Sequence, residues 1–191
     1  MKEEKTVFYP YSSWLKQRYG EKVYKLPVNL PVSCPNRCDG HGGCTFCSEK
    51  GTGFESVWQP ASVTEQMQHA RDVVAKRYKA RKFIAYFQNY TNTFMAMELF
   101  KAYLEEAAAF PDVVEISVST RPDCIRTDYL ACLAELQERT HVGINIELGL
   151  QTANYHTLDS VHRGHGLAEY IDAVLAIKRY PFTVCTHLIA N

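Results

Sequence analysis

Residues 33–51 read SCPNRCDGHGGCTFCSEKG, a glycine-rich segment in which four cysteines lie close together. They are Cys34, Cys38, Cys44 and Cys47, with the spacing C-x3-C-x5-C-x2-C. Four clustered thiols favour a metal centre, because free surface thiols would be open to oxidation. Three centres fit the residues: zinc on four sulfurs, an iron–sulfur cluster on four thiolates, or a cluster on three thiolates with one open iron. Spacing alone does not choose among them.

Beyond the cysteine segment, helical and extended patterns alternate along the chain. The expected helices cover 62–78, 95–110, 127–139 and 166–180. The expected strands cover 82–88, 113–119, 141–151 and 182–190. Ser62 and Glu65 stand at capping-box spacing, and Thr127 is the expected N-cap of its helix. Strands joined through helices require crossover connections, so the sequence predicts an α/β fold with a parallel sheet.

The segment before the cysteines completes the expected domain. An apolar stretch at 24–33 is the predicted first strand and leads directly into the cysteine loop. Residues 1–23 form a predicted N-terminal extension with a short amphipathic helix, SSWLKQRYG, and 24–191 form the core. Because a parallel sheet rarely stops on a strand without its covering helix, we expect the core to be truncated after its fifth strand.

Composition narrows the function classes. Lys plus Arg and Asp plus Glu number 21 each in 191 residues, which argues against a broad electrostatic footprint for nucleic acid. The N-terminus has no apolar signal region, and no run of about 18 apolar residues occurs. We therefore expect a cytoplasmic protein without membrane contact, in which structural disulfides are rare. We interpret the remaining cysteines as small buried apolar residues, namely Cys124, Cys132 and Cys185.

Several separated motifs carry a family resemblance. CPNRCDGHGGCTFCSEKGTGF, AYFQNYTNTF, ELGLQTANYHTLDSVHRGH and THLIAN resemble, in this order, the radical S-adenosylmethionine (SAM) superfamily in its YhcC/YtqA-type branch. That branch is related to the Elongator catalytic subunit and to oxygen-independent coproporphyrinogen dehydrogenases. The resemblance implies a partial (β/α) barrel and a [4Fe–4S] cluster on Cys34, Cys44 and Cys47, with SAM at the fourth iron. Phe46 is expected to place backbone near the adenine.

Cys38 departs from the family pattern, which needs no cysteine at that position. It is either a spare thiol or a replacement for Cys34, since Cys38 would give the spacing C-x5-C-x2-C. We expect Cys34 to be the ligand, because the tripeptide CPN places it at the end of the first strand.

Polar residues at the strand ends are the candidate cofactor contacts, because parallel sheets bind ligands at the carboxyl ends of their strands. The resemblance implies that Ser119 and Gln151 contact the SAM ribose. It also implies that Arg163 pairs with the methionine carboxylate, which suits a planar guanidinium. The segment after the second strand holds the methionine amino group in the family, but here it lacks the usual acidic residue. Its candidates are Gln88 and Asn89.

The resemblance implies reductive cleavage of SAM to methionine and a 5′-deoxyadenosyl radical, with electrons from a flavodoxin- or ferredoxin-like donor. The residues do not identify a further catalytic group. Relatives in the branch are implicated in modifying the wobble uridine of tRNA, so tRNA is an expected partner, with AKRYKARK (75–82) as a candidate basic surface. The alternative is a zinc- or iron–sulfur-binding structural or electron-transfer module without SAM chemistry.

Overall fold

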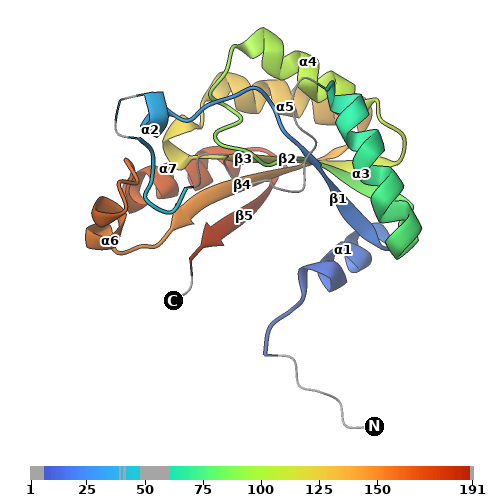
Figure 1. The fold of residues 1–191 in the computed structure, drawn as a ribbon, viewed down its shortest axis with the longest axis horizontal. Helices are drawn as coiled ribbons and strands as arrows, with labels where there is room; N and C mark the ends of the chain where they lie inside the picture. The colour runs from blue at the N-terminus through green and yellow to red at the C-terminus, as the bar shows by residue number, and fades with distance from the viewer. Residues whose placement is uncertain (1–6, 39, 41, 48–60, 190–191) are drawn as a thin grey trace.

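The computed structural model describes residues 7–38, 40, 42–47 and 61–189, and within them the chain forms one parallel sheet. Its strands lie in the order β1-β2-β3-β4-β5, and every neighbouring pair is parallel (Figure 1). Their bounds are β1 Val23–Val28, β2 Lys82–Phe87, β3 Val113–Thr120, β4 Gly143–Gln151 and β5 Thr183–Leu188. Because β1 and β5 are separate edges, the sheet is open. The prediction of an α/β fold with a partial barrel is confirmed.

Helices connect the strands as the sequence patterns indicate. The crossover helices are α3 Val63–Tyr78, α4 Met97–Ala108, α5 Thr127–Thr140 and α7 Leu167–Ile177. The predicted capping box of α3 is present: Glu65 N–H donates to Ser62 Oγ at 3.2 Å, and Ser62 N–H donates to Glu65 Oε2 at 2.8 Å. The predicted cap of α5 is wrong by one residue. Arg126 is the N-cap, with extended backbone and its carbonyl accepting from Leu130 N–H, and Thr127 is the first helical residue.

The predicted first strand was too long, because the chain leaves the sheet after Val28. The backbone groups of Asn29 are bonded to a helix side chain instead: Asn29 N–H donates to Gln66 Oε1 at 2.8 Å, and Gln66 Nε2 donates to Asn29 O at 3.1 Å. Pro31 follows closely and has no N–H to offer a neighbouring strand. Residues 29–33 therefore lie outside the sheet and connect β1 to the cysteine loop.

Four further elements are short. They are α1 Tyr11–Tyr19, α2 Pro35–Cys38, α6 Tyr155–Ser160 and the 3₁₀ helix η1 Pro122–Cys124. The sequence patterns predicted α1 but not the other three, because three to six residues are too few to show a helical period. In α6 the cap is the signal that was missed, since Asn154 Oδ1 accepts a hydrogen bond from Thr157 N–H at 3.1 Å.

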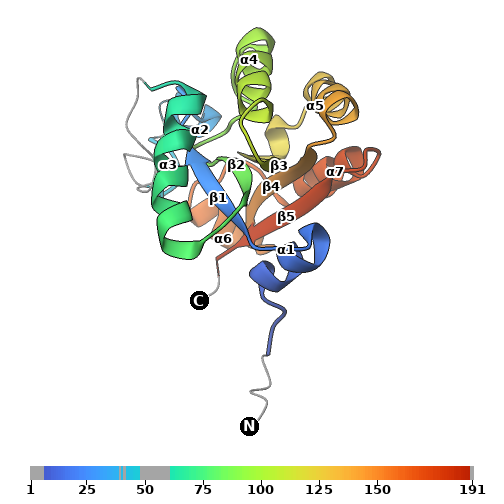
Figure 2. The same ribbon diagram turned by 90° about the vertical axis from the view of Figure 1, so that its right-hand side faces the viewer.

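The main core lies between the sheet and the crossover helices. Figure 2 shows α3, α4, α5 and α7 in an arc along the outer face of the sheet, with α1 on the other side. Ile116, Val118, Ile144, Ile146 and Leu148 alternate along β3 and β4, are fully buried and belong to this outer core. Each such side chain contributes about 1.5–3 kcal/mol by burial, so this layer fixes the register of the two strands.

The inner face of the same strands is polar. Residues between the apolar positions point to it, namely Glu115, Ser117, Ser119, Asn145 and Glu147. Helix α1 covers one end, where Leu15 packs with Val23 and Ile84 and where the Tyr19 hydroxyl donates to Glu115 Oε2 at 2.6 Å. The sequence alone does not say which face Glu147 takes, and the pleat places it inside. The inner face therefore offers hydrogen-bonding groups, which an ordinary core would exclude.

Candidate metal and cofactor site

A cavity of about 310 Å³ opens where the strands end, beside the cysteine loop. The predicted site residues that line it are Cys34, Cys44, Phe46, Cys47, Gln88, Ser119, Gln151 and Arg163. Asn89 is not among its lining residues. It is buried, with 3% of its surface exposed. The structure thus brings together eight of the nine residues proposed from sequence, although their roles as ligands stay predictions.

The cysteine loop gains its shape from backbone hydrogen bonds. Cys34 O accepts from Arg37 N–H at 2.9 Å, which starts the turn of α2, and Gly43 N–H donates back to Asn36 O at 3.0 Å. Gly43 has a φ of +92°, and a Cβ there would lie 3.2 Å from Arg37 Cγ. A glycine is therefore required where the loop turns toward Cys44. The segment beyond Cys47, residues 48–60, lies outside the described residues.

The four cysteines of the loop are not equivalent. Cys44 is buried at 6% exposure, Cys34 and Cys47 are half-buried, and all three line the cavity. Cys38 is exposed, does not line this cavity, and its thiol lies 3.6 Å from Ser33 Oγ. All seven cysteines of the chain lie in the described part and are free thiols. The geometry therefore separates three candidate ligands from one surface thiol.

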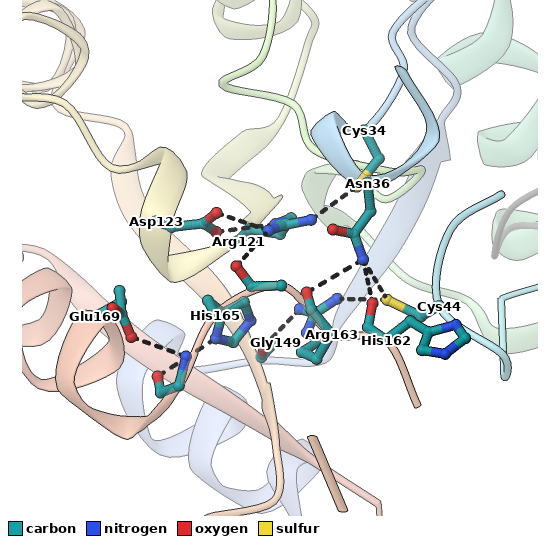
Figure 3. Close-up of polar contacts among 12 residues, drawn as sticks. Cys34, Asn36, Cys44, Arg121, Asp123, Gly149, His162, Arg163, His165 and Glu169 are labelled. Atoms are coloured by element: carbon teal, nitrogen blue, oxygen red, sulfur yellow. Dashed lines mark hydrogen bonds and ion pairs between the residues drawn. The ribbon is translucent and has the colours of Figure 1, made fainter. Parts of the chain in front are cut away.

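Each of the three cavity sulfurs has a guanidinium group next to it. The pairs are Arg121 Nη1 with Cys34 Sγ at 3.6 Å, Arg163 Nη1 with Cys44 Sγ at 3.6 Å and Arg37 Nη2 with Cys47 Sγ at 3.7 Å. Figure 3 shows the first two pairs side by side. Cationic donors offset the negative charge that thiolates and a sulfide-containing cluster bring into a protein. The arrangement suits an anionic iron–sulfur centre better than three neutral thiols.

Arg121 is fixed from its other side by Asp123. Arg121 Nε donates to Oδ1 at 2.9 Å and Nη2 donates to Oδ2 at 2.6 Å, a two-pronged pair (Figure 3). Only 4% of the Arg121 side chain is exposed, and this burial by itself would lower its pKa. The hydrogen bonds to Asp123 and Cys34 have the larger combined effect, so the pKa of Arg121 lies above its usual value. The guanidinium therefore stays charged and keeps Nη1 aimed at Cys34.

Arg163 is anchored to the fourth strand. Its Nη2 donates to Gly149 O at 2.6 Å, and a Cβ on Gly149 would lie 2.6 Å from that nitrogen. The absence of a side chain at Gly149 is what admits the guanidinium. Arg163 Nε is buried and has no hydrogen bond, so one donor remains for a ligand.

Asn36 joins the cysteine loop to the segment between α6 and α7. Its Nδ2 donates to His162 O, to Arg163 O at 3.2 Å and toward Cys44 Sγ at 3.4 Å. Gly164, with a φ of +74°, lies against the same side chain, because a Cβ there would be 2.4 Å from Asn36 Oδ1. This contact holds Arg163 and Cys44 at a fixed separation.

The residues around the cavity fit a polar ligand beside a cluster. Thr91 Oγ1 and Arg163 Nε are buried cavity-lining atoms without a hydrogen bond. Ser119 Oγ is also buried without a hydrogen bond of ordinary geometry, although the Tyr86 hydroxyl is near enough to interact with it. Buried polar atoms without partners are costly, so such a group of them indicates a missing ligand. SAM presents a carboxylate, an amino group and ribose hydroxyls, which match donors and acceptors of this kind.

A second charged group lines the cavity further down the inner face. Glu147 accepts from Lys25 Nζ at 2.5 Å and lies 2.8 Å from His187 Nε2. Burial works to raise the pKa of Glu147, but His187 and Lys25 overcome it and lower the pKa to about 2. The hydrogen bond of His187 to Cys185, and to a smaller extent its hydrogen bond to Glu147, raise the pKa of His187 to about 9. This end of the cavity therefore carries two cations and one anion at neutral pH.

Of the groups that surround the sulfurs, sequence reasoning selected Arg163 and missed the others. Arg37, Asn36 and Arg121 were not selected as site residues, because their roles depend on contacts across 8 to 87 positions of sequence. One local signal existed for Arg121, which directly follows β3 and precedes an aspartate by two residues.

Comparison with known proteins agrees with the geometry. The family model described as the radical SAM superfamily matches residues 29–190, which include the cysteine loop and strands β2 to β5. The chain belongs to the radical SAM superfamily. Membership implies SAM and a [4Fe–4S] cluster as cofactors, and the three cavity cysteines are the residues here that fit such a cluster.

Curated relatives cover nearly the whole of this radical SAM chain. YtqA of Bacillus subtilis is 38% identical over 178 residues, 92% of this chain and 54% of the relative. YhcC of Escherichia coli K12 is 37% identical over 179 residues, 93% of this chain and 56% of the relative. Archaeosine synthase subunit beta of Methanosarcina acetivorans is 24% identical over 153 residues, 77% and 42% of the two chains. The chain thus spans about half the length of these relatives.

One solved structure supports the fold. The cobalamin-dependent SAM radical enzyme OxsB, with aqua-cobalamin and SAM bound, matches with a TM-score of 0.50 and 13% identity. The match covers 85% of this chain and 23% of OxsB.

In the described part of the chain, no helix combines the length and apolar character needed to cross a membrane.

Proposed function

We propose that this protein cleaves SAM reductively at a [4Fe–4S] cluster bound by Cys34, Cys44 and Cys47. One observation supports the proposal above others: three of the four loop sulfurs line one cavity, each beside a guanidinium, while Cys38 is exposed outside it. Three protein thiolates leave one iron for an outside ligand, whereas four would close the site. When bound, the cluster and SAM together supply a 5′-deoxyadenosyl radical for hydrogen abstraction.

The residues of this chain bind and orient the cofactor in this proposal. Arg163 is the candidate partner of the methionine carboxylate, because its buried Nε lacks a hydrogen bond and its Nη1 is already beside Cys44. Ser119 and Gln151, which lie in the last two residues of neighbouring strands, are candidates for the ribose hydroxyls. Gln88 and Phe46 line the same cavity and complete the proposed SAM site.

The proposed reaction is tested by anaerobic reconstitution with iron and sulfide, followed by dithionite and SAM. We expect 5′-deoxyadenosine and methionine, measured by chromatography and mass spectrometry. Cys44→Ala and Cys47→Ala should abolish both products, whereas Cys38→Ala should retain most of the turnover. A reconstituted cluster that gives no deoxyadenosine would instead support the electron-transfer alternative, and tightly bound zinc without iron would support the structural one.

The proposed substrate class is tRNA, modified at the wobble uridine, with a flavodoxin- or ferredoxin-like protein as the electron donor. The family resemblance supports this substrate and this base, whereas one relative, whose name assigns it to the synthesis of archaeosine, supports only a nucleoside substrate and not the wobble uridine. The position of the basic run 75–82 does not support a role for it in bringing a tRNA base to the cavity. It begins near the end of α3 and finishes at Lys82, where β2 starts, about 20 Å along the strand from Gln88 at the cavity.

The substrate is tested separately from SAM cleavage. Total tRNA and labelled SAM are incubated anaerobically with the reduced protein, and the nucleosides are analysed by mass spectrometry. We expect one nucleoside to change mass in a SAM-dependent manner, and the change to disappear with Cys44→Ala. Deoxyadenosine release without any change in tRNA would refute the substrate and leave the SAM chemistry standing.

A further inference from the structure

We infer that Glu147, Cys185 and His187 form a second metal site, separate from the cysteine loop, for a borderline divalent cation such as Zn²⁺. The pleat brings the three residues together: Glu147 on β4 pairs with Cys185 on β5, and His187 lies two positions further along β5 on the same face. One donor atom from each residue lies within 4.8 Å of the other two. The inference does not depend on the proposed SAM chemistry.

The distances are close to those of a real site. Tetrahedral zinc with nitrogen and oxygen near 2.0 Å and sulfur near 2.3 Å requires donor atoms roughly 3.3–3.8 Å apart. Glu147 Oε2 and His187 Nε2 are 2.8 Å apart, and the third donor is within 4.8 Å. Rotation of side-chain ends by about an ångström would complete the arrangement, and His187, whose side chain is 45% exposed, has the freedom to rotate.

The donor set selects the kind of ion. One thiolate, one imidazole and one carboxylate form the mixture that zinc prefers, whereas magnesium and calcium bind oxygen donors. Three protein ligands leave a fourth position open, which is the pattern of a catalytic site. Because Glu147 and His187 line the cavity that also holds the cysteine loop, an oxygen or nitrogen donor of a substrate would reach that position from the cavity.

An outer shell already holds the carboxylate in the required orientation. Lys25 Nζ donates to Glu147 Oε1 at 2.5 Å, and Asn145 Nδ2 lies 3.4 Å from the same oxygen. Asn145 is itself fixed through a hydrogen bond to Ser117 Oγ at 2.9 Å. Oε1 is therefore occupied by these donors, while Oε2 faces His187 and is the oxygen left for a metal. Such second contacts commonly orient metal ligands, and losing them weakens binding.

The test must exclude zinc bound by the cysteine loop. The full chain is first reconstituted with its iron–sulfur cluster, so that the loop sulfurs are occupied, and is then equilibrated with Zn²⁺ against a chromophoric chelator. We expect about one zinc per chain by elemental analysis. Cys185→Ala and His187→Gln should each lower zinc affinity at least tenfold without changing the iron content. The matched controls, Cys132→Ala and His156→Gln, should bind zinc as the wild type does.

A second arm gives a spectroscopic signature. In a chain with Cys34, Cys38, Cys44 and Cys47 all changed to Ser, Co²⁺ should show a thiolate-to-metal charge-transfer band that disappears with Cys185→Ala. His187→Gln, on a half-exposed edge strand, should lose the zinc while keeping the circular dichroism spectrum of the folded wild type, although its melting temperature falls because the pair with Glu147 is gone. If the wild type binds no zinc, or if Cys185→Ala and His187→Gln retain zinc affinity like the controls, the second site is refuted.

Discussion

Arg121 Nη1 lies 3.6 Å from Cys34 Sγ, and the two residues are 87 positions apart. The contact joins the loop after the first strand to the end of the third, and Asp123 fixes its geometry through two hydrogen bonds. It places a permanent positive charge beside one corner of the proposed cluster. The charge of Arg121 therefore provides a direct way to test whether a cluster occupies the site.

Replacing Arg121 by Gln should make the cluster harder to reduce. An added electron is stabilised by a nearby cation, so removing the cation shifts the midpoint potential to more negative values. The shift is measured by potentiometric titration of the reconstituted protein, with iron content as a check on assembly. Cluster loading should fall at most modestly, because Cys34, Cys44 and Cys47 remain.

Arg126→Gln is the matched control for that change. Arg126 pairs with Asp128 as Arg121 pairs with Asp123, but both residues of this pair are exposed, and among the described contacts Arg126 has none with a loop cysteine. Its replacement should leave the potential unaltered. Equal potentials in Arg121→Gln, Arg126→Gln and wild type would contradict a cluster at Cys34.

The choice of Cys34 over Cys38 predicts different iron contents. Cys34→Ala should lose most of the reconstituted iron, since its sulfur lines the cavity beside Arg121. Cys38→Ala should retain close to four irons per chain, because Cys38 is exposed outside the cavity. Iron and sulfide assays on the four single variants provide the measurement. The reverse result, with Cys38 essential and Cys34 dispensable, would show that the ligand choice is wrong.

Gly164→Ala should destabilise the fold and displace Arg163. The backbone φ of +74° costs an alanine about 1–2 kcal/mol, and its Cβ would lie 2.4 Å from Asn36 Oδ1. Gly20→Ala has a similar φ of +79° with nothing within 4 Å, so it isolates the backbone cost. Urea unfolding should show a larger loss for Gly164→Ala than for Gly20→Ala. Equal losses would mean that the contact between Gly164 and Asn36 is unimportant.

The pair of His187 and Glu147 predicts a stability that falls at alkaline pH. The pKa of His187 is raised to about 9 from 6.5, so the folded protein binds its proton more tightly than the unfolded chain. The contribution is fully present below pH 6.5 and is lost as pH rises through 9. Metal-free wild type should therefore lose more stability than His187→Gln between pH 6 and 10 in urea titrations. Parallel pH curves for the two proteins would contradict the ion pair.

Much of the fold could be predicted because its signals are local. The capping box at Ser62 and the alternating apolar residues of β4 fix a helix start and a strand within a few positions. The length of the first strand was predicted wrongly because its cause is not local. Asn29 leaves the sheet because Gln66, far along the chain, takes its hydrogen bonds, and no period in the sequence reveals that.

The candidate site was predictable in its sulfurs and in Arg163, but not in its other charged groups. The cysteine spacing drew attention to Cys34, Cys44 and Cys47, and the strand ends drew attention to Ser119 and Gln151. Arg121 follows the end of the third strand, but its contact with Cys34 forms only when the strands align, and the contact of Asn36 with Cys44 depends on how the loop turns. The inner-face group of Glu147, Cys185 and His187 likewise depends on the register of β4 with β5.

The central claim is that three cysteines leave one iron open for SAM. It is tested most directly by electron–nuclear double resonance on the reduced, anaerobic protein with SAM labelled in its amino nitrogen and carboxylate oxygen. The account predicts hyperfine coupling of both labels to the cluster, retained in Cys38→Ala. A fully assembled cluster that shows no coupling to either label, in wild type and in Cys38→Ala alike, would contradict it.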